Sequence, residues 1–91
     1  MMKTLVVYEL VHLDEEKLRN AYNNNLQIAW RFIFKRVVPD SYADDKNKFE
    51  DKVLPSIIDD LEEMGKRGRF DVRLQSPQGF FSLLEGRFLT V

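Results

Sequence analysis

The sequence has no cysteine, which excludes disulfides, thiolate nucleophiles and cysteine-ligated metal centres. A single histidine excludes histidine-rich metal sites and every mechanism that needs two imidazoles. No apolar run approaches the ~18 residues of a membrane span, and the first residues lack the pattern of a secretory signal. Four glycines and three prolines are too few for a fibrous or low-complexity chain. We therefore expect a soluble, cytoplasmic protein that does not contact a membrane.

The residues that are present are typical of one folded domain. Hydrophobic residues make up 44% and charged residues 32% of the 91 residues, a mixture that supports a hydrophobic core. This length leaves no room for a second domain, so we expect residues 1–91 to form a single one. The formal net charge is −1 and the pI is about 5.8, which argues against generic binding of polyanions.

Charge is unevenly distributed along the chain. Residues 1–39 carry a net charge of +2, residues 40–63 carry −6, and residues 64–91 carry +3. An acidic middle segment between two mildly basic ends is the clearest electrostatic feature of the sequence.

The N-terminal part of the chain predicts a strand followed by a long helix. Residues 4–13 are rich in Val, Leu and Tyr and contain no breaker, which is typical of a buried strand. Asp14 has the character of a helix N-cap. Apolar residues then recur at three- and four-residue steps as far as Val37, which favours a helix that ends before Pro39.

The segment 26–38 also permits a second interpretation. Side chains with poor helix propensity alternate along it, namely Ile28, Trp30, Phe32 and Phe34. The asparagines at 23–25 would then end a short helix before a strand over 26–38. We favour the helix, because polar residues at helical spacing continue unbroken as far as Lys35.

Residues 40–64 predict a second helix with an irregularity at Pro55. Asp40 or Ser41 is a suitable N-cap for this helix. Its buried stripe is formed by Phe49, Val53, Ile57, Leu61 and Met64. Pro55 removes one backbone donor, so it kinks the helix or splits it in two. Gly65 suits the left-handed residue that terminates a helix.

The last quarter of the chain predicts strands. Apolar and polar residues alternate over 70–75, and the residues at 76–79 are those of a tight turn. Strands over 80–84 and 87–91, joined by a turn at Glu85, would complete an antiparallel meander. A short helix between Pro77 and Gly86 is the alternative for the segment 77–85.

These elements predict an α+β domain of order β-α-α-β-β-β, in which a mostly antiparallel sheet packs against two helices and the second helix is kinked at Pro55.

Nothing in the sequence matches a known catalytic motif. There is no Gly-x-Ser-x-Gly elbow and no glycine-rich phosphate loop. His12 lies beside an acidic helix start, where a structural role is typical. Asp59, Glu62 and Glu63 have the one-turn spacing that can hold a hard cation, but solvated helix faces are usually charged in the same way. We therefore expect no enzymatic activity, no cofactor and no metal.

Three candidate binding surfaces remain. The first is an aromatic helix face with more apolar surface than a small domain normally covers, made by Trp30, Phe34, Phe32 and Ile28. Either the second helix or another chain would cover this face.

The second surface is acidic and consists of Asp59, Asp60, Glu62 and Glu63. It suits a basic groove on another protein, unless it is only the solvated side of a helix.

The third surface is basic and consists of Arg67, Arg69 and Arg73, next to Phe70. The acidic segment immediately upstream of these arginines would repel phosphate unless it faces away from them.

The leading functional hypothesis is a non-catalytic protein-binding module that acts by stoichiometric association, such as an inhibitor, an immunity-type protein or a small regulator. Homodimerisation through the first helix, which carries these aromatic residues, is its companion hypothesis. The alternative is a small regulator that binds nucleic acid through Arg67, Arg69 and Arg73, although the composition makes nucleic acid the less expected partner.

Overall fold

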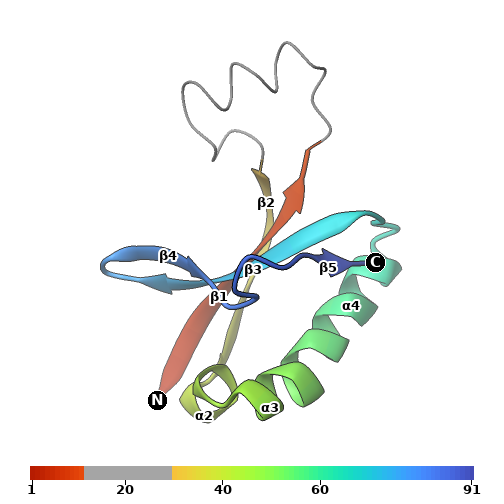
Figure 1. Ribbon diagram of the computed structural model, residues 1–91. Coiled ribbons are helices and arrows are strands. Elements are labelled where there is room, and N and C mark those ends of the chain that lie inside the picture. The colour runs from red at the N-terminus through yellow and green to blue at the C-terminus, as the bar shows by residue number, and fades with distance from the viewer. Residues whose placement is uncertain (12–29) are drawn as a thin grey trace.

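The computed structural model describes residues 1–11 and 30–91 (Figure 1). Its strands are β1 (Met2–Leu10), β2 (Trp30–Pro39), β3 (Arg69–Ser76), β4 (Gly79–Ser82) and β5 (Leu89–Thr90). Between β2 and β3 lie the helices α2 (Asp40–Asp44), α3 (Lys46–Lys48) and α4 (Leu54–Glu63), with a π-helical turn, η2 (Phe49–Val53), joining the last two. The predicted α+β class is confirmed.

The strands form one antiparallel sheet in the order β2-β1-β3-β4, and β5 also pairs with β3. The helices from α2 to α4 run together along one side of this sheet, as Figure 1 shows. The core lies between the two layers. It consists mainly of Leu5, Val7, Phe70 and Val72 from the sheet and Phe49, Val53, Ile57 and Leu61 from the helices, with Val38 and Leu84 at its margins.

The prediction of a helix as far as Val37 is wrong for residues 30–39, which form strand β2. The alternative, a strand over this segment, is confirmed there, while residues 14–29 of the predicted helix lie outside the described residues. The physical reason is that β-branched and aromatic side chains pack well on a pleated surface, and β1 supplies a partner along the whole length of β2.

The second helix is confirmed over residues 46–63, where it continues through Pro55, but residues 40–44 form a separate short helix, α2, that ends at Asp45 in extended backbone. Proline has no amide hydrogen and its ring clashes with the carbonyl one turn earlier, so a regular α-helix cannot pass through it. The missing donor and the ring clash at Pro55 are accommodated by the π-helical turn η2. In this turn the amide of Leu54 donates to the carbonyl of Phe49, five residues before it. Pro55 then lies in the first turn of α4, where its missing donor costs little.

The two ends of this helix differ in how well they were predicted. No side chain caps α2, so the expected caps at Asp40 and Ser41 are wrong. The main helix begins instead at Asp45, whose Oδ1 accepts from the amides of Asn47 and Lys48 at 2.9 and 3.2 Å.

At the other end, Gly65 terminates α4 as predicted, with φ of +73°. Its amide donates to Glu62, and the next amide, of Lys66, donates to Leu61, which is the Schellman arrangement. Met64 was expected in the buried stripe but is 52% exposed, because the helix ends there and turns away from the sheet.

The C-terminal part is β as predicted, with one difference in pairing. Ser76 and Gly79 close a tight hairpin, so 79–82 is a strand and the short-helix alternative is wrong. The turn at Glu85 and Gly86 is present. However, β5 does not continue a meander beside β4. It returns to pair with the first residues of β3, in line with β4 on the same edge.

Candidate binding surface

The sheet has one side that faces the helices and one side that no helix or strand of the described part covers. Side chains alternate along β1, so Leu5 and Val7 join the core while Val6 and Tyr8 point to the other side. Val6 is only 1% exposed although it lies outside the core cluster. The large side chains around it must therefore shield it on the side away from the helices.

A β-bulge determines which aromatic side chains of β2 reach that side. Val7 pairs with Phe34 but the next residue, Tyr8, pairs with Phe32, so Ile33 is an extra residue in β2. The bulge reverses the alternation, and Phe34 therefore faces the helices while Phe32 and Trp30 face away from them.

The predicted aromatic face is thus only partly formed. Trp30 and Phe32 lie together on the side of the sheet away from the helices, whereas Phe34 packs against the core. Ile28 lies outside the described residues. The face also belongs to a strand and not to a helix, which corrects the expectation from the sequence.

Aromatic side chains from three strands, β1, β2 and β4, and from the loop before β5 gather on this side. The Tyr8 ring makes edge-on contacts with Phe32 and Phe80, each with ring centroids 6.4 Å apart. Trp30 stacks at a tilt on Phe88, with centroids 5.7 Å apart. Phe32, Phe80 and Phe88 are 52%, 49% and 47% exposed, so half of each ring meets solvent.

Arg73 ties the two ring groups together. Its guanidinium lies over the rings of Tyr8 and Trp30, 4.6 and 5.4 Å from their centroids. The Arg73 Nε donates to Asp71 Oδ2 at 2.8 Å, and the Ser82 hydroxyl donates to Asp71 Oδ1 at 2.7 Å. Both side chains are largely shielded, with 17% of Arg73 and 8% of Asp71 exposed, so this network holds the guanidinium in a fixed position.

Two more cations flank the rings. The Arg69 guanidinium lies 5.6 Å from the centroid of Phe88, and Lys35 pairs with Val6 across the strands on the same side of the sheet. We call this surface the open face. It consists of Tyr8, Trp30, Phe32, Lys35, Arg69, Asp71, Arg73, Phe80 and Phe88.

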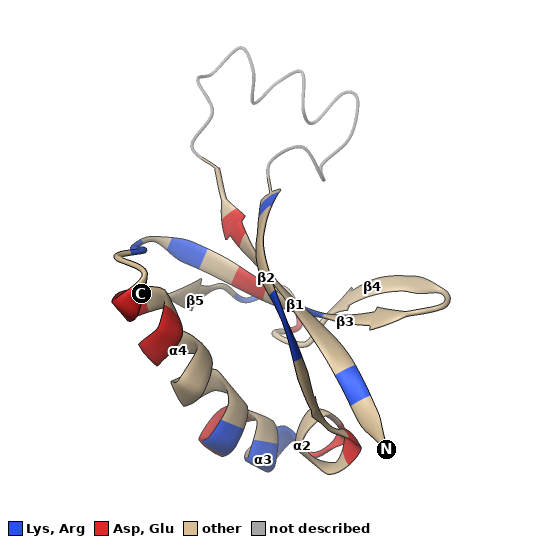
Figure 2. Cartoon of the chain, turned by 180° about the vertical axis from the view of Figure 1, so that it is seen from behind, with Lys and Arg blue, Asp and Glu red and all other residues tan. Residues whose placement is uncertain are grey.

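Of the predicted basic residues, the structure brings Arg69 and Arg73 together on the open face, because residues two apart in a strand share a side. Arg67 is exposed in the turn that precedes β3. Figure 2 shows these basic residues on β3 and its preceding turn, and the acidic residues in the last turns of α4 on the other layer.

The predicted acidic residues do not form a uniform surface. Asp59, Glu62 and Glu63 are exposed on α4. Asp60 instead turns toward the sheet and forms an ion pair with Arg36 of β2, which also donates to the Ser56 hydroxyl at 2.5 Å. All four lie in the helix layer, on the side of the sheet away from the open face.

Glu9 is held by two cations on the helix side of the sheet. Partial burial raises the pKa of this carboxyl, but hydrogen bonds and ion pairs from Arg31 and Lys66 outweigh burial and hold the pKa below its usual value. Glu9 is therefore ionised at neutral pH and joins β1, β2 and the turn before β3.

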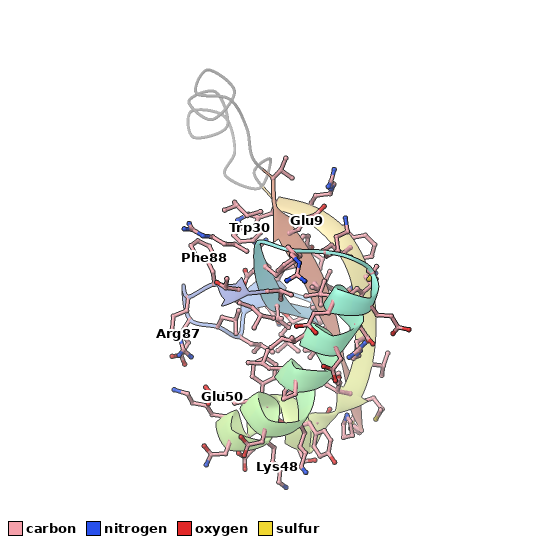
Figure 3. All side chains as sticks on the ribbon, turned by 90° about the vertical axis from the view of Figure 1, so that its right-hand side faces the viewer. Glu9, Trp30, Lys48, Glu50, Arg87 and Phe88 are labelled. Atoms are coloured by element: carbon pink, nitrogen blue, oxygen red, sulfur yellow. The ribbon has the colours of Figure 1, made fainter. Side chains whose placement is uncertain are left out.

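A shallow groove runs between the helix layer and the turn at 83–86. It is lined by Phe49, Leu54 and Leu84, and an ion pair of 3.6 Å between Arg87 and Glu50 crosses it (Figure 3). Figure 3 also shows Phe88 beside Trp30, at the upper end of this groove. The groove therefore adjoins the open face at Phe88.

Three aromatic residues of the open face were not predicted as functional, namely Tyr8, Phe80 and Phe88. Each belongs to a segment that was correctly expected to be β, but their meeting depends on strand order, which the sequence does not show. The alternation of Tyr8 with Val7 was the only available signal.

Within residues 1–11 and 30–91, no cluster of three or more His, Cys, Asp or Glu residues is arranged to hold a metal ion. None of the helices in this part of the chain is long and apolar enough to cross a membrane. A comparison of the chain with protein families, curated proteins and solved structures finds no match.

Proposed function

We propose that the protein is a non-catalytic binding module that acts by stoichiometric association, and that the open face is its binding surface. The observation that supports this proposal is the contiguous group of half-exposed rings on a side of the sheet that the described helices leave uncovered. Antiparallel sheets that face water on one side normally carry polar side chains there. Aromatic rings in their place are typical of a surface that a partner covers.

The apolar area at stake is large enough to contribute to binding. A phenylalanine buries roughly 150–250 Å², so three half-exposed rings leave about 300 Å² of apolar surface in water. At about 25 cal/mol per Å², covering all three would supply roughly 7 kcal/mol before the costs of association. Phe32, Phe80 and Phe88 are therefore the expected anchors of the contact.

The arginines strengthen the same argument. Arg, Trp, Tyr and Phe are the residue types enriched at the centres of protein interfaces. Arg73 is already held in place by Asp71, so it loses little side-chain freedom when a partner binds. A protein partner, including a second copy of the chain, is the partner that the sequence favours.

The test of this proposal is photo-crosslinking in cells that naturally make the protein. A photoreactive phenylalanine analogue is placed at Phe32 in one variant and at Phe81 in the other. Phe81 is 52% exposed like Phe32 but pairs with Leu74, so it points to the helix side of the sheet. We expect a discrete crosslinked adduct from position 32 and none from position 81. Equal adducts from both positions, or none from either, would contradict the proposal.

A further inference from the structure

The charges of the described residues are divided between the two sides of the sheet. The open face carries three cations, Lys35, Arg69 and Arg73, and one carboxylate, Asp71. The structure describes twelve Asp and Glu residues, and the other eleven lie on the helix-facing side of β1, on or between the helices, or in the turn at 83–86. The open face is therefore positive in a protein whose net charge is negative.

This division removes the main argument against a nucleic acid as partner. The segment 40–63, with its net charge of −6, precedes the basic residues of β3 in sequence but lies in the helix layer behind the sheet. It therefore does not stand between the open face and an approaching phosphate. Negative charge on the far side also orients the molecule, because an anionic partner is attracted to the open face and repelled from the helices.

The positive charge also argues against a second copy of the chain as the occupant. In a symmetric dimer the same surface meets itself, so the cations of one open face would approach those of the other. With three cations and one carboxylate, each open face has an excess of positive charge. An identical face on a second copy cannot neutralise this excess. The occupant that complements this face must carry negative charge and also cover flat aromatic rings.

We infer that the open face binds a single-stranded nucleic acid, with bases stacked on its half-exposed rings and phosphates near its arginines and lysine. The inference rests on the proposed function in that the open face is the binding surface, but it assigns a nucleic acid as the partner in place of the protein that the sequence favours. Bases stack on aromatic side chains regardless of sequence, and Arg and Lys contact the phosphates between them. Arg73 already lies over Tyr8 and Trp30, and Arg69 lies over Phe88, so Phe32 and Phe80 are the rings most available to bases.

The structure also predicts which nucleic acid is excluded. In a duplex the bases are stacked on one another and their faces are not available to side chains. A flat surface with three cations would then offer only weak contacts to the backbone. Single strands should therefore bind more tightly than a duplex of the same length.

The test is fluorescence anisotropy of a labelled 12-nucleotide oligouridine titrated with the full-length protein. Two or three phosphate contacts predict a salt slope of about −1.4 to −2.1, so the affinity should fall roughly 7- to 20-fold between 50 and 200 mM salt. Phe32→Ala and Phe80→Ala should each weaken binding by about fivefold or more. Arg69→Ala should reduce the size of the slope by about 0.7. Phe81→Ala, on the opposite side, should leave affinity unchanged.

The possible outcomes separate the inference from the proposed function. No binding of oligouridine or oligothymidine at 50 mM salt and 100 µM protein overturns the inference, as does equal binding of a duplex or an equal loss in Phe81→Ala. If crosslinking at Phe32 then yields an adduct with a protein, the open face is a protein-binding surface and only the nucleic acid is wrong. If crosslinking also fails, both proposals fall. Circular dichroism of each variant shows that a loss of binding is not a loss of folding.

Discussion

Removal of the Asp71 carboxylate should destabilise the fold, although Asp71 lies on the open face and not in the core between sheet and helices. The side chain is 8% exposed and accepts two hydrogen bonds, from Arg73 Nε at 2.8 Å and from the Ser82 hydroxyl at 2.7 Å. Hydrogen bonds to a charged group contribute about 1.5–3 kcal/mol each, and Asp71→Ala also leaves a largely shielded guanidinium without its counter-charge. Because Arg73 keeps some access to water, we expect a loss of about 3 kcal/mol.

The measurement is urea unfolding followed by far-UV circular dichroism. Ser82→Ala removes only the hydroxyl donor and should cost about 1 kcal/mol. In a double-mutant cycle, Asp71→Ala and Arg73→Ala should show a coupling of about 1–3 kcal/mol, because each removes the partner of the other. If Asp71→Ala changes stability by less than about 0.5 kcal/mol and the coupling is near zero, the pair is solvated and the claim that it fixes the guanidinium is wrong.

Four further predictions concern the rest of the fold and use the same unfolding assay. Ile57→Ala should cost about 2–5 kcal/mol, because the side chain is fully buried between the layers; a loss below 1 kcal/mol would mean that the helix is not packed as described. Gly65→Ala should cost about 1 kcal/mol, because φ at this helix end is +73°. Glu85→Gly should raise stability by up to about 1 kcal/mol, because a non-glycine residue there has φ of +53°; a loss instead would show that the Glu85 side chain makes a stabilising contact. Glu9 has a lowered pKa in the folded state, so its contribution is complete above the unfolded value of about 4.3 and is lost as pH falls through the folded pKa. The stability difference between wild type and Glu9→Gln should therefore be constant above pH ~5.5 and shrink on acidification, and a difference that does not depend on pH would contradict this assignment.

The helix around Ile57 and the turn at Gly65 were predictable because both depend on neighbours in sequence. A buried stripe at helical spacing and a glycine after its last member are local signals, and each decides one element. The segment 30–39 was mispredicted for the opposite reason. Its aromatic and β-branched residues satisfy both a helical and a strand pattern, and the choice is made by β1, which pairs with it along its full length.

The binding surface was less predictable than the fold, because it depends on non-local pairing. Trp30 and Phe34 share a side in any regular strand, yet the extra residue Ile33 sends them to opposite sides. Phe80 reaches Tyr8 only because β3 lies between their strands in the sheet order, and Phe88 reaches Trp30 only because β5 returns to β3. No periodicity within one segment contains this information.

The rings of the open face do not all serve the same purpose, and the difference determines which variants test function. The rings of Tyr8 and Trp30 both lie against the guanidinium of Arg73, whose side chain is only 17% exposed, so their removal would uncover a largely shielded charge. Their contribution is therefore partly to stability. Phe32 and Phe80 contact Tyr8 only edge-on and leave half of their surface in water, which shields little of the fold. Because folding gains little from that exposed half, binding of a partner is the better explanation for exposed rings at these positions. Phe32 and Phe80 are therefore the positions where binding can be lost while the sheet stays intact.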